Sequence, residues 1–179
     1  SLFYVKFMSN DRIQGPGSWT TFASSQSWVS WCGIAFENVC LKHIHQLKQA
    51  LGIGGVHSEH YVWRDIPLKQ EDGAQIDLLI DRQDQCINVC EMKFSKSEFE
   101  ISKKYAHELQ NKLNVFQAKT KTRKTLFLTM VSTHGVKNLA SYQGLIQSEI
   151  TMDAPCRISH SPVSFDTAKT AAVSIIVRN

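Results

Sequence analysis

Two strand-like segments in the middle of the chain each carry one acidic residue among aliphatic neighbours. Asp77 lies in the segment 75–81, and Glu91 lies in the segment 85–93. An ionised carboxylate in such surroundings is costly unless a bound metal ion or a structural ion pair compensates it. A hairpin centred on Asp84 would place Asp77 opposite Glu91, with Cβ atoms about 4.5–5.5 Å apart. Two carboxylates held that close suit a hard, oxygen-seeking cation such as Mg²⁺ or Mn²⁺.

Lys93 follows Glu91 by two positions, which puts both side chains on one face of a strand, about 6.6 Å apart. An ammonium group beside a metal-bound water can orient that water and stabilise charge on an attacked phosphate. The carbonyl oxygen of Met92, between them, is a further candidate metal ligand. The ordinary alternative is that Glu91 and Lys93 form an exposed ion pair with little effect on stability.

A fourth candidate, Glu37, belongs to a predicted helix. Apolar residues recur at helical spacing over residues 28–51, and Gly52 is expected to end that helix. Glu37 lies beside the apolar stripe, in register with Ile34 and Leu41, so its carboxylate can look towards a sheet and assist a metal site. A glutamate at the border of a helical stripe is also an ordinary surface residue, and that alternative stays open.

The elements that must position these residues predict an α/β fold. A first strand is expected near residues 56–64, followed by the central hairpin, a polar-rich helix over residues 96–118 and a last strand over residues 125–131. The last strand is apolar almost throughout, as strands buried on both faces are. The order helix, three strands, helix, strand predicts a mixed central sheet flanked by helices.

The whole chain has the size of one domain. It has 179 residues, a formal net charge of +4 and a hydrophobic content of 42%, which allows a real core and fits contact with a polyanion. Five cysteines without framework spacing favour a reducing compartment, and no apolar run is long enough to span a bilayer. We therefore expect a soluble, cytoplasmic protein with no membrane association, in which residues 1–27 form a connector.

The motif formed by these residues resembles a known nuclease signature. Ile76-Asp77, thirteen intervening residues and Glu91-Met92-Lys93 resemble the PD-(D/E)XK pattern, with isoleucine in place of its proline. More specifically, four segments resemble the nuclease-like C-terminal domain of a group of archaeal and bacterial P-loop ATPases; these are residues 31–37, 73–77, 90–93 and 122–129. The resemblance covers about residues 1–152, with the nuclease-like domain at 28–152, while residues 153–179 match nothing in that family.

The resemblance implies a restriction-endonuclease-like core and a metal-dependent active site. In that site Asp77, Glu91 and Glu37 would hold Mg²⁺ or Mn²⁺, and Lys93 would position the attacking water. An ATPase region and a winged helix precede the domain in that family. This chain contains no phosphate-binding G-x-x-x-x-G-K-[ST] motif, so the expected partner is an upstream ATPase domain of a longer protein.

Basic residues suggest a second kind of contact. A cluster enters the last predicted strand and could touch a phosphate backbone in a salt-dependent, sequence-independent way; its members are Lys119, Lys121, Arg123 and Lys124. Lys112, on the second predicted helix, is a weaker candidate of the same kind, with Lys103 and Lys104. Such runs are usually solvated loops, and that alternative also stays open.

Other groupings give weaker signals. Cys86 and Cys90 would lie about 13 Å apart along a strand, too far to bind one zinc ion. Ser132-Thr133-His134 invites a catalytic-triad interpretation, but no nucleophile elbow accompanies it.

These patterns lead to one expected function and two alternatives. The expected function is metal-dependent phosphodiester hydrolysis, with DNA as the nucleic acid. The first alternative is a nuclease-like domain that no longer cuts and serves as a nucleic-acid-binding or regulatory module of an ATPase. The second is a protein–protein docking module for a partner ATPase, which predicts concentration-dependent association through the tryptophan-rich residues 19–31. A homo-oligomer is a separate candidate assembly.

Overall fold

The computed structural model describes residues 23–65 and 73–152. By compactness the chain divides into two units, residues 1–35 with 159–179 and residues 36–158. Its helices and strands are α2 (Gln26–Lys42), α3 (Ile44–Ala50), β1 (Ser58–Arg64), β2 (Gln75–Arg82), β3 (Cys86–Lys93), α4 (Lys103–Thr120), β4 (Thr125–Ser132), the 3₁₀ helix η3 (Leu139–Tyr142) and β5 (Ser148–Thr151). The unit boundary falls inside α2, and every predicted catalytic residue belongs to the second unit.

The second unit is built on a five-stranded mixed sheet in the order β1-β2-β3-β4-β5. The pairs β1–β2 and β2–β3 are antiparallel, whereas β3–β4 and β4–β5 are parallel. The chain crosses from β3 to the parallel β4 through α4, as parallel neighbours require. The predicted α/β fold with a mixed, helix-flanked sheet is confirmed, and the structure adds η3 and β5, which the sequence patterns did not predict.

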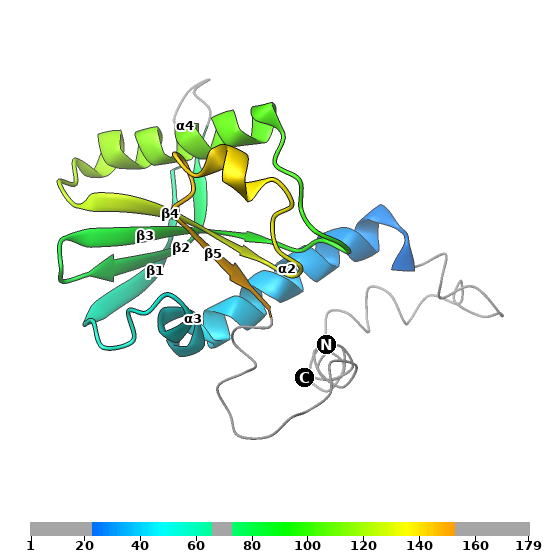
Figure 1. Cartoon of the computed structure of the whole chain (residues 1–179), viewed down its shortest axis with the longest axis horizontal. Coiled ribbons are helices and arrows are strands. Elements are labelled where there is room, and N and C mark those ends of the chain that lie inside the picture. Colours follow the sequence, from blue (N-terminus) through cyan, green and yellow to red (C-terminus); the bar gives the residue numbers. More distant parts are fainter. Residues whose placement is uncertain (1–22, 66–72, 153–179) are drawn as a thin grey trace. The chain divides into compact units, whose positions relative to one another are not determined.

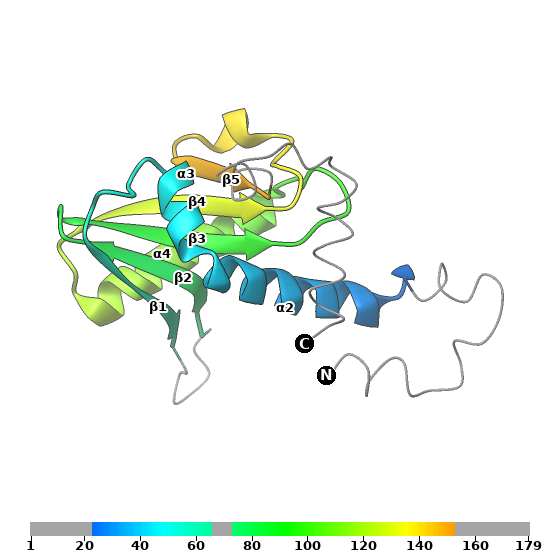
Figure 2. The same ribbon diagram turned by 90° about the horizontal axis from the view of Figure 1, so that it is seen from below.

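Helix α4 covers one face of the sheet, and α3 with the end of α2 covers the other (Figures 1 and 2), so each face carries its own hydrophobic core. The α4-side core joins α4 to one face; its buried members are Ile76, Leu79, Ile87, Val89, Ile101, Leu109, Phe116, Leu128, Met130, Val136 and Ile146. The α3-side core joins α3 and the end of α2 to the other face; its buried members are Phe36, Cys40, Leu47, Ile53, Leu78, Ile80, Cys90, Met92, Val131 and Ile150. In β3 the odd-numbered residues therefore face α4 and the even-numbered ones face α3.

The alternation in β2 is broken at Asp77. Ile76 belongs to the α4-side core, but Leu78 belongs to the α3-side core, although residues two apart normally share a face. The pairing with β1 shows why: Trp63 pairs with Ile76 and Tyr61 with Leu79, so two residues of β2, Asp77 and Leu78, lie opposite one of β1. This is a β-bulge, a feature that is common beside active sites.

The first helical region differs from the prediction of one helix over residues 28–51. Helix α2 ends at Lys42, and α3 begins at Ile44 after His43, whose φ of −114° and ψ of 31° leave the helical region. No proline or glycine marks this break. The two segments nevertheless contribute Cys40 and Leu47 to the same α3-side core, which indicates that packing against the sheet sets the change of direction.

Helix α4 begins seven residues later than predicted. Its N-cap is Ser102, whose hydroxyl accepts the backbone N–H of Tyr105 at 3.1 Å. The residues expected to form its first turns instead pair with the loop after β4, where Phe99 and Val136 make a parallel bridge. Lys121 then ends the helix with a left-handed φ of 54°.

The described part of the first unit, residues 23–35, carries the start of α2. The backbone N–H of Trp28 donates to the Ser25 hydroxyl at 3.2 Å, which caps the start of the helix. The rings of Trp28 and Trp31 stack at 5.2 Å between centroids.

Most of the predicted connector, and all of the predicted tail at 153–179, lie outside the described residues. Within the described residues, none of the helices has the length and apolar character needed to cross a bilayer.

Candidate active site

The bulge frees Asp77 from regular pairing and turns its carboxylate to the neighbouring strand. The β2–β3 ladder has the register predicted for a hairpin centred on Asp84, from Leu78 opposite Cys90 onwards. The ladder does not continue to a pair between Asp77 and Glu91. Oδ2 of Asp77 accepts the backbone N–H of Met92 at 2.9 Å, so the side chain takes the role that a backbone carbonyl has in a regular strand.

Glu91 is almost fully buried, with 7% of its surface exposed, and faces α4. Its Oε1 accepts the hydroxyl of Tyr105 at 2.9 Å, and its Oε2 accepts the ammonium of Lys112 at 2.6 Å. Both donors come from α4. A buried carboxylate needs such partners, because leaving it without them would cost far more than an exposed charge does. The alternative of an exposed ion pair between Glu91 and Lys93 is wrong, because Glu91 is buried and pairs with Lys112.

The carboxylates lie close enough to perturb one another. Burial, and then the Glu91 carboxylate, raise the pKa of Asp77 to about 6, against the opposing effects of the Met92 N–H and Lys112. Burial and Glu91 also raise the pKa of Glu37, while Lys93 and Lys112 lower it. The three carboxylates of Asp77, Glu91 and Glu37 therefore lie within electrostatic reach of one another, and Lys93 lies within reach of Glu37, although Asp77 does not pair with Glu91 in the way the hairpin register predicted.

Lys93 is held by aromatic rings. Its ammonium lies 5.0 Å from the ring centre of Tyr105 and 5.6 Å from that of Phe99, distances typical of cation–π contacts. Tyr105 thus touches both members of the Glu91/Lys93 motif, one through its hydroxyl and the other through its ring. This arrangement keeps the ammonium on the α4 side of the sheet, next to the carboxylates.

The donors present fit a hard divalent cation. Asp77 and Glu91 offer carboxylate oxygens, and burial followed by the neighbouring Glu91 carboxylate raises the pKa of Asp77, so an added positive charge would favour its ionised form. Glu37 is a third carboxylate within electrostatic reach. In residues 23–65 and 73–152, however, no three His, Cys, Asp or Glu side chains are already arranged as a metal-holding group. The side chain of Met92 is buried in the α3-side core, so only its backbone could face such an ion.

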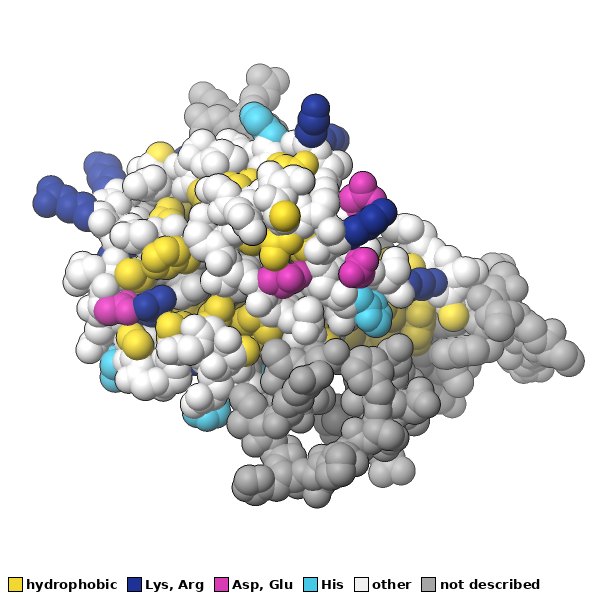
Figure 3. Space-filling model, in the orientation of Figure 1, with side chains coloured by type: hydrophobic (Ala, Val, Ile, Leu, Met, Phe, Trp, Pro, Cys, Tyr) yellow, Lys and Arg dark blue, Asp and Glu magenta, His cyan; other side chains and the backbone are white. Residues whose placement is uncertain are grey.

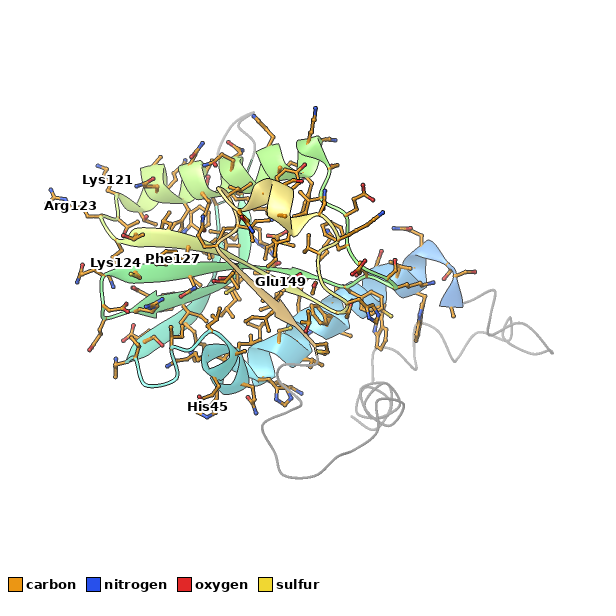
Figure 4. All side chains as sticks on the ribbon, in the orientation of Figure 1. His45, Lys121, Arg123, Lys124, Phe127 and Glu149 are labelled. Carbon is orange, nitrogen blue, oxygen red and sulfur yellow. The ribbon has the colours of Figure 1, made fainter. Side chains whose placement is uncertain are left out.

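The basic cluster lies at the other end of the sheet. It precedes Thr125, which pairs with Cys86 at the start of β3, whereas Lys93 pairs with Ser132. Seven strand steps of about 3.3 Å separate the two ends by roughly 23 Å. Lys121 and Arg123 point away from the body of the molecule beyond the end of α4 (Figure 4).

The other predicted phosphate contacts have ion-pair partners. Lys124 binds Oδ1 of Asp81 at 2.5 Å and the Arg82 carbonyl at 2.8 Å, and Lys119 lies 3.6 Å from Asp65. Lys112 is bound to Glu91. In the view of Figure 3, basic side chains stand around the rim of the molecule with acidic ones among them.

The sequence interpretation missed two features of the candidate site: the contacts of Tyr105 and the position of Lys112 beside Glu91. The signal was available, because Tyr105, Leu109, Lys112 and Phe116 are spaced by four, three and four residues and share one face of a helix. A lysine on an otherwise apolar stripe indicates a buried acidic partner. The sequence does not identify that partner, since it depends on how α4 docks on the sheet.

The weaker groupings have structural roles. The Ser132 hydroxyl accepts the N–H of Gly135 at 3.0 Å, and the Thr133 hydroxyl bonds the backbone N–H and carbonyl of Ser95 at 2.9 and 2.7 Å.

Burial raises the pKa of the Cys40 and Cys90 thiols to about 12, which does not favour a thiolate zinc site there.

Comparisons with known proteins add little. No model of a protein family matches the chain, and no curated protein matches it. A solved structure described as a protein of unknown function, AF1548, aligns with a TM-score of 0.44 and 11% identity, covering 73% of this chain and 75% of that one. A likeness at this level carries no argument about function.

Proposed function

We propose that this chain is a metal-dependent nuclease domain of the PD-(D/E)XK type that hydrolyses phosphodiester bonds in DNA. The observation that carries the proposal is that the Asp77 carboxylate bonds the backbone N–H of Met92, the residue after Glu91, while Lys93 lies on the same strand face as Glu91. In this proposal the domain works in the cytoplasm as part of a longer protein that has an ATPase region upstream.

The proposed roles follow from the contacts of each residue. A bound Mg²⁺ or Mn²⁺ would supply Lewis-acid stabilisation and a water of lowered pKa. Asp77 is held in place by the Met92 N–H, and Glu91 is oriented by the Tyr105 hydroxyl. The rings of Phe99 and Tyr105 hold the Lys93 ammonium, which would act on an attacking water or on a phosphate oxygen. Glu37 adds a third carboxylate from a different element.

The test is cleavage of supercoiled plasmid and of single-stranded DNA in Mg²⁺, with and without a chelator. Asp77→Ala and Lys93→Ala are each expected to lower the rate by about 10²-fold or more, because each removes a group that acts on the charge formed in the transition state. Asp84→Ala and Lys103→Ala are matched controls, since they remove the same charges from the hairpin turn and from the exposed start of α4. Equal rates in all five proteins would disprove the assignment.

The competing proposal is a nuclease-like domain that binds nucleic acid without cutting it. The observation in its favour is that Lys112 already neutralises one carboxylate of the site. It predicts no cleavage by the unmodified protein and salt-dependent DNA binding that Asp77→Ala leaves unchanged. Fluorescence anisotropy at two salt concentrations, run beside the cleavage assay, separates the two proposals.

A further inference from the structure

Lys112 occupies an unusual position for a lysine. It lies on the face of α4 that packs on the sheet, between Leu109 and Phe116 of the α4-side core, and a quarter of its side chain is exposed. Its ammonium is 2.6 Å from Oε2 of Glu91, whose side chain is 9% exposed. The pair is thus largely withdrawn from water, where a charge without its partner is costly.

The ammonium also acts on the other two carboxylates. Lys112 lowers the pKa of Asp77 and that of Glu37, so its positive charge lies within electrostatic reach of all three acidic residues. Lys93, by contrast, is held over the rings of Phe99 and Tyr105. The two lysines of the site therefore have different partners, and Lys112 is the one bound to a carboxylate oxygen that a metal ion would use.

We propose that Lys112 is a resident counter-ion that holds Glu91 in the metal-free protein and competes with the divalent cation for Oε2. This inference rests on the proposed metal-dependent function and adds a means of regulating it. Lys112 is a positioning residue in this role. The Tyr105 hydroxyl on Oε1 keeps the Glu91 carboxylate oriented while the ammonium leaves, so the exchange requires one side chain to move and leaves the strand unchanged.

The competition has a measurable consequence for metal affinity. A positive charge about 5 Å from a divalent cation opposes its binding, and even in the dielectric of water this repulsion amounts to about tenfold in affinity. Lys112→Gln removes the charge and is therefore expected to tighten Mn²⁺ binding by about tenfold. Loss of a purely structural ion pair would have the opposite effect, because a disordered Glu91 binds a metal more weakly.

The experiment is calorimetric titration of Mn²⁺ into the full chain at one pH and ionic strength. Lys104→Gln is the matched control, because Lys104 lies on the same helix but pairs at 3.9 Å with the exposed Glu108. Lys112→Arg keeps the positive charge and should bind Mn²⁺ within a few-fold of the unmodified protein. Lys112→Met, which keeps the length of the apolar stem, replaces the glutamine variant if circular dichroism shows that the latter is unfolded.

The outcomes separate this inference from the proposed function. Tighter binding in Lys112→Gln or Lys112→Met, with Lys104→Gln unchanged, supports the competition. Mn²⁺ binding that depends on Asp77 but is equal or weaker without Lys112 overturns the competition and leaves the metal site standing. Absence of Asp77-dependent binding in both the unmodified protein and the Lys112 variants overturns both. Binding seen only after Lys112 is replaced supports a counter-ion that excludes the metal.

Discussion

A carboxylate inside a protein can be stabilised by hydrogen bonds or by opposite charge, and Glu91 has one of each. Asp77 has a single backbone N–H donor, at Met92. This asymmetry explains why the protein raises the pKa of Asp77, where burial and the neighbouring Glu91 act together. In the proposed metal site, Asp77 is therefore the carboxylate whose ionised form an added cation would favour.

The raised pKa of Asp77 predicts how stability depends on pH. Its pKa is about 6 in the folded protein and near 3.8 unfolded, so between these values the folded state binds more protons. The free energy of unfolding should therefore fall as the pH rises from about 4 to about 6. Asp77→Asn, which cannot ionise, should be more stable than the unmodified protein at pH 7 by about 1–3 kcal/mol.

Urea unfolding in a chelator at pH 4, 5, 6 and 7 measures this difference. The advantage of Asp77→Asn should vanish near pH 4, where the native aspartate is itself protonated, so the two proteins serve as each other's control. An advantage that does not change with pH would show that the ionisation of Asp77 has no part in it.

Residue types and spacing correctly predicted the register of the hairpin from Leu78 opposite Cys90 onwards and the shared strand face of Glu91 and Lys93, because these depend on local sequence, but they predicted an Asp77–Glu91 pair that the ladder does not contain. They were not sufficient for Tyr105, whose contacts with Glu91 and Lys93 require α4 to be docked on the sheet. The bulge at Asp77 was missed for a related reason. It becomes visible only when Ile76 and Leu78 are assigned to opposite faces.

At the scale of elements, the site depends on how two loops are joined. The loop between β3 and α4 pairs with the loop after β4: Phe99 bridges Val136, and the side chain of Asn138 bonds both the N–H and the carbonyl of Ile101 at 3.0 Å. This pairing fixes the residue at which α4 begins. It therefore also sets the position along β3 at which Tyr105 contacts Glu91. It also explains why the helix begins at Lys103, although the sequence pattern allowed an earlier start.

The contacts of Asn138 predict that Asn138→Ala lowers the free energy of unfolding by about 1–3 kcal/mol, because two backbone groups of Ile101 lose their partner. Asn114→Ala is the control: Asn114 accepts a hydrogen bond from Gln110 on the exposed surface of α4, and its loss should change stability by less than about 0.5 kcal/mol. Chemical denaturation of the three proteins measures both effects, and equal costs would contradict a clamping role for Asn138.

The break between α2 and α3 at His43 could not be predicted from the sequence pattern. The apolar spacing of residues 28–51 describes one helix equally well, since Cys40 and Leu47 lie seven residues apart on either side of the break. The chain changes direction without a glycine or proline. Only the position of the sheet beneath the two helices determines where this change occurs.

At the scale of the second unit, two cores on opposite faces of one sheet support the site. Leu109 is fully buried on the α4 side, and Leu47 is buried to the same degree on the α3 side. Each leucine-to-alanine change should cost about 2–5 kcal/mol through lost transfer energy and the cavity left behind. Because the sheet separates the two sites, the costs should add to within about 0.5 kcal/mol in the double variant.

Thermal and urea unfolding of the two single variants and the double variant test this expectation. Leu41→Ala, at a half-buried position of α2, should cost less than either and serves as the control. A double variant destabilised by much more than the sum of the two single costs would mean that the two faces are coupled through the strands.

The overall α/β architecture was predictable from the order of the periodic segments, whereas β5 was too short to give a pattern of its own.

The irregularity at position 77 has one more implication. If Asp77 were omitted, Ile76, Leu78, Leu79 and Ile80 would alternate between the two faces without interruption, and Val62 of β1 would face Leu78 alone. Asp77 is therefore an extra residue in the apolar pattern of β2. Deletion of one codon at this position would remove the acidic side chain while the remaining apolar residues kept their alternation between the two faces.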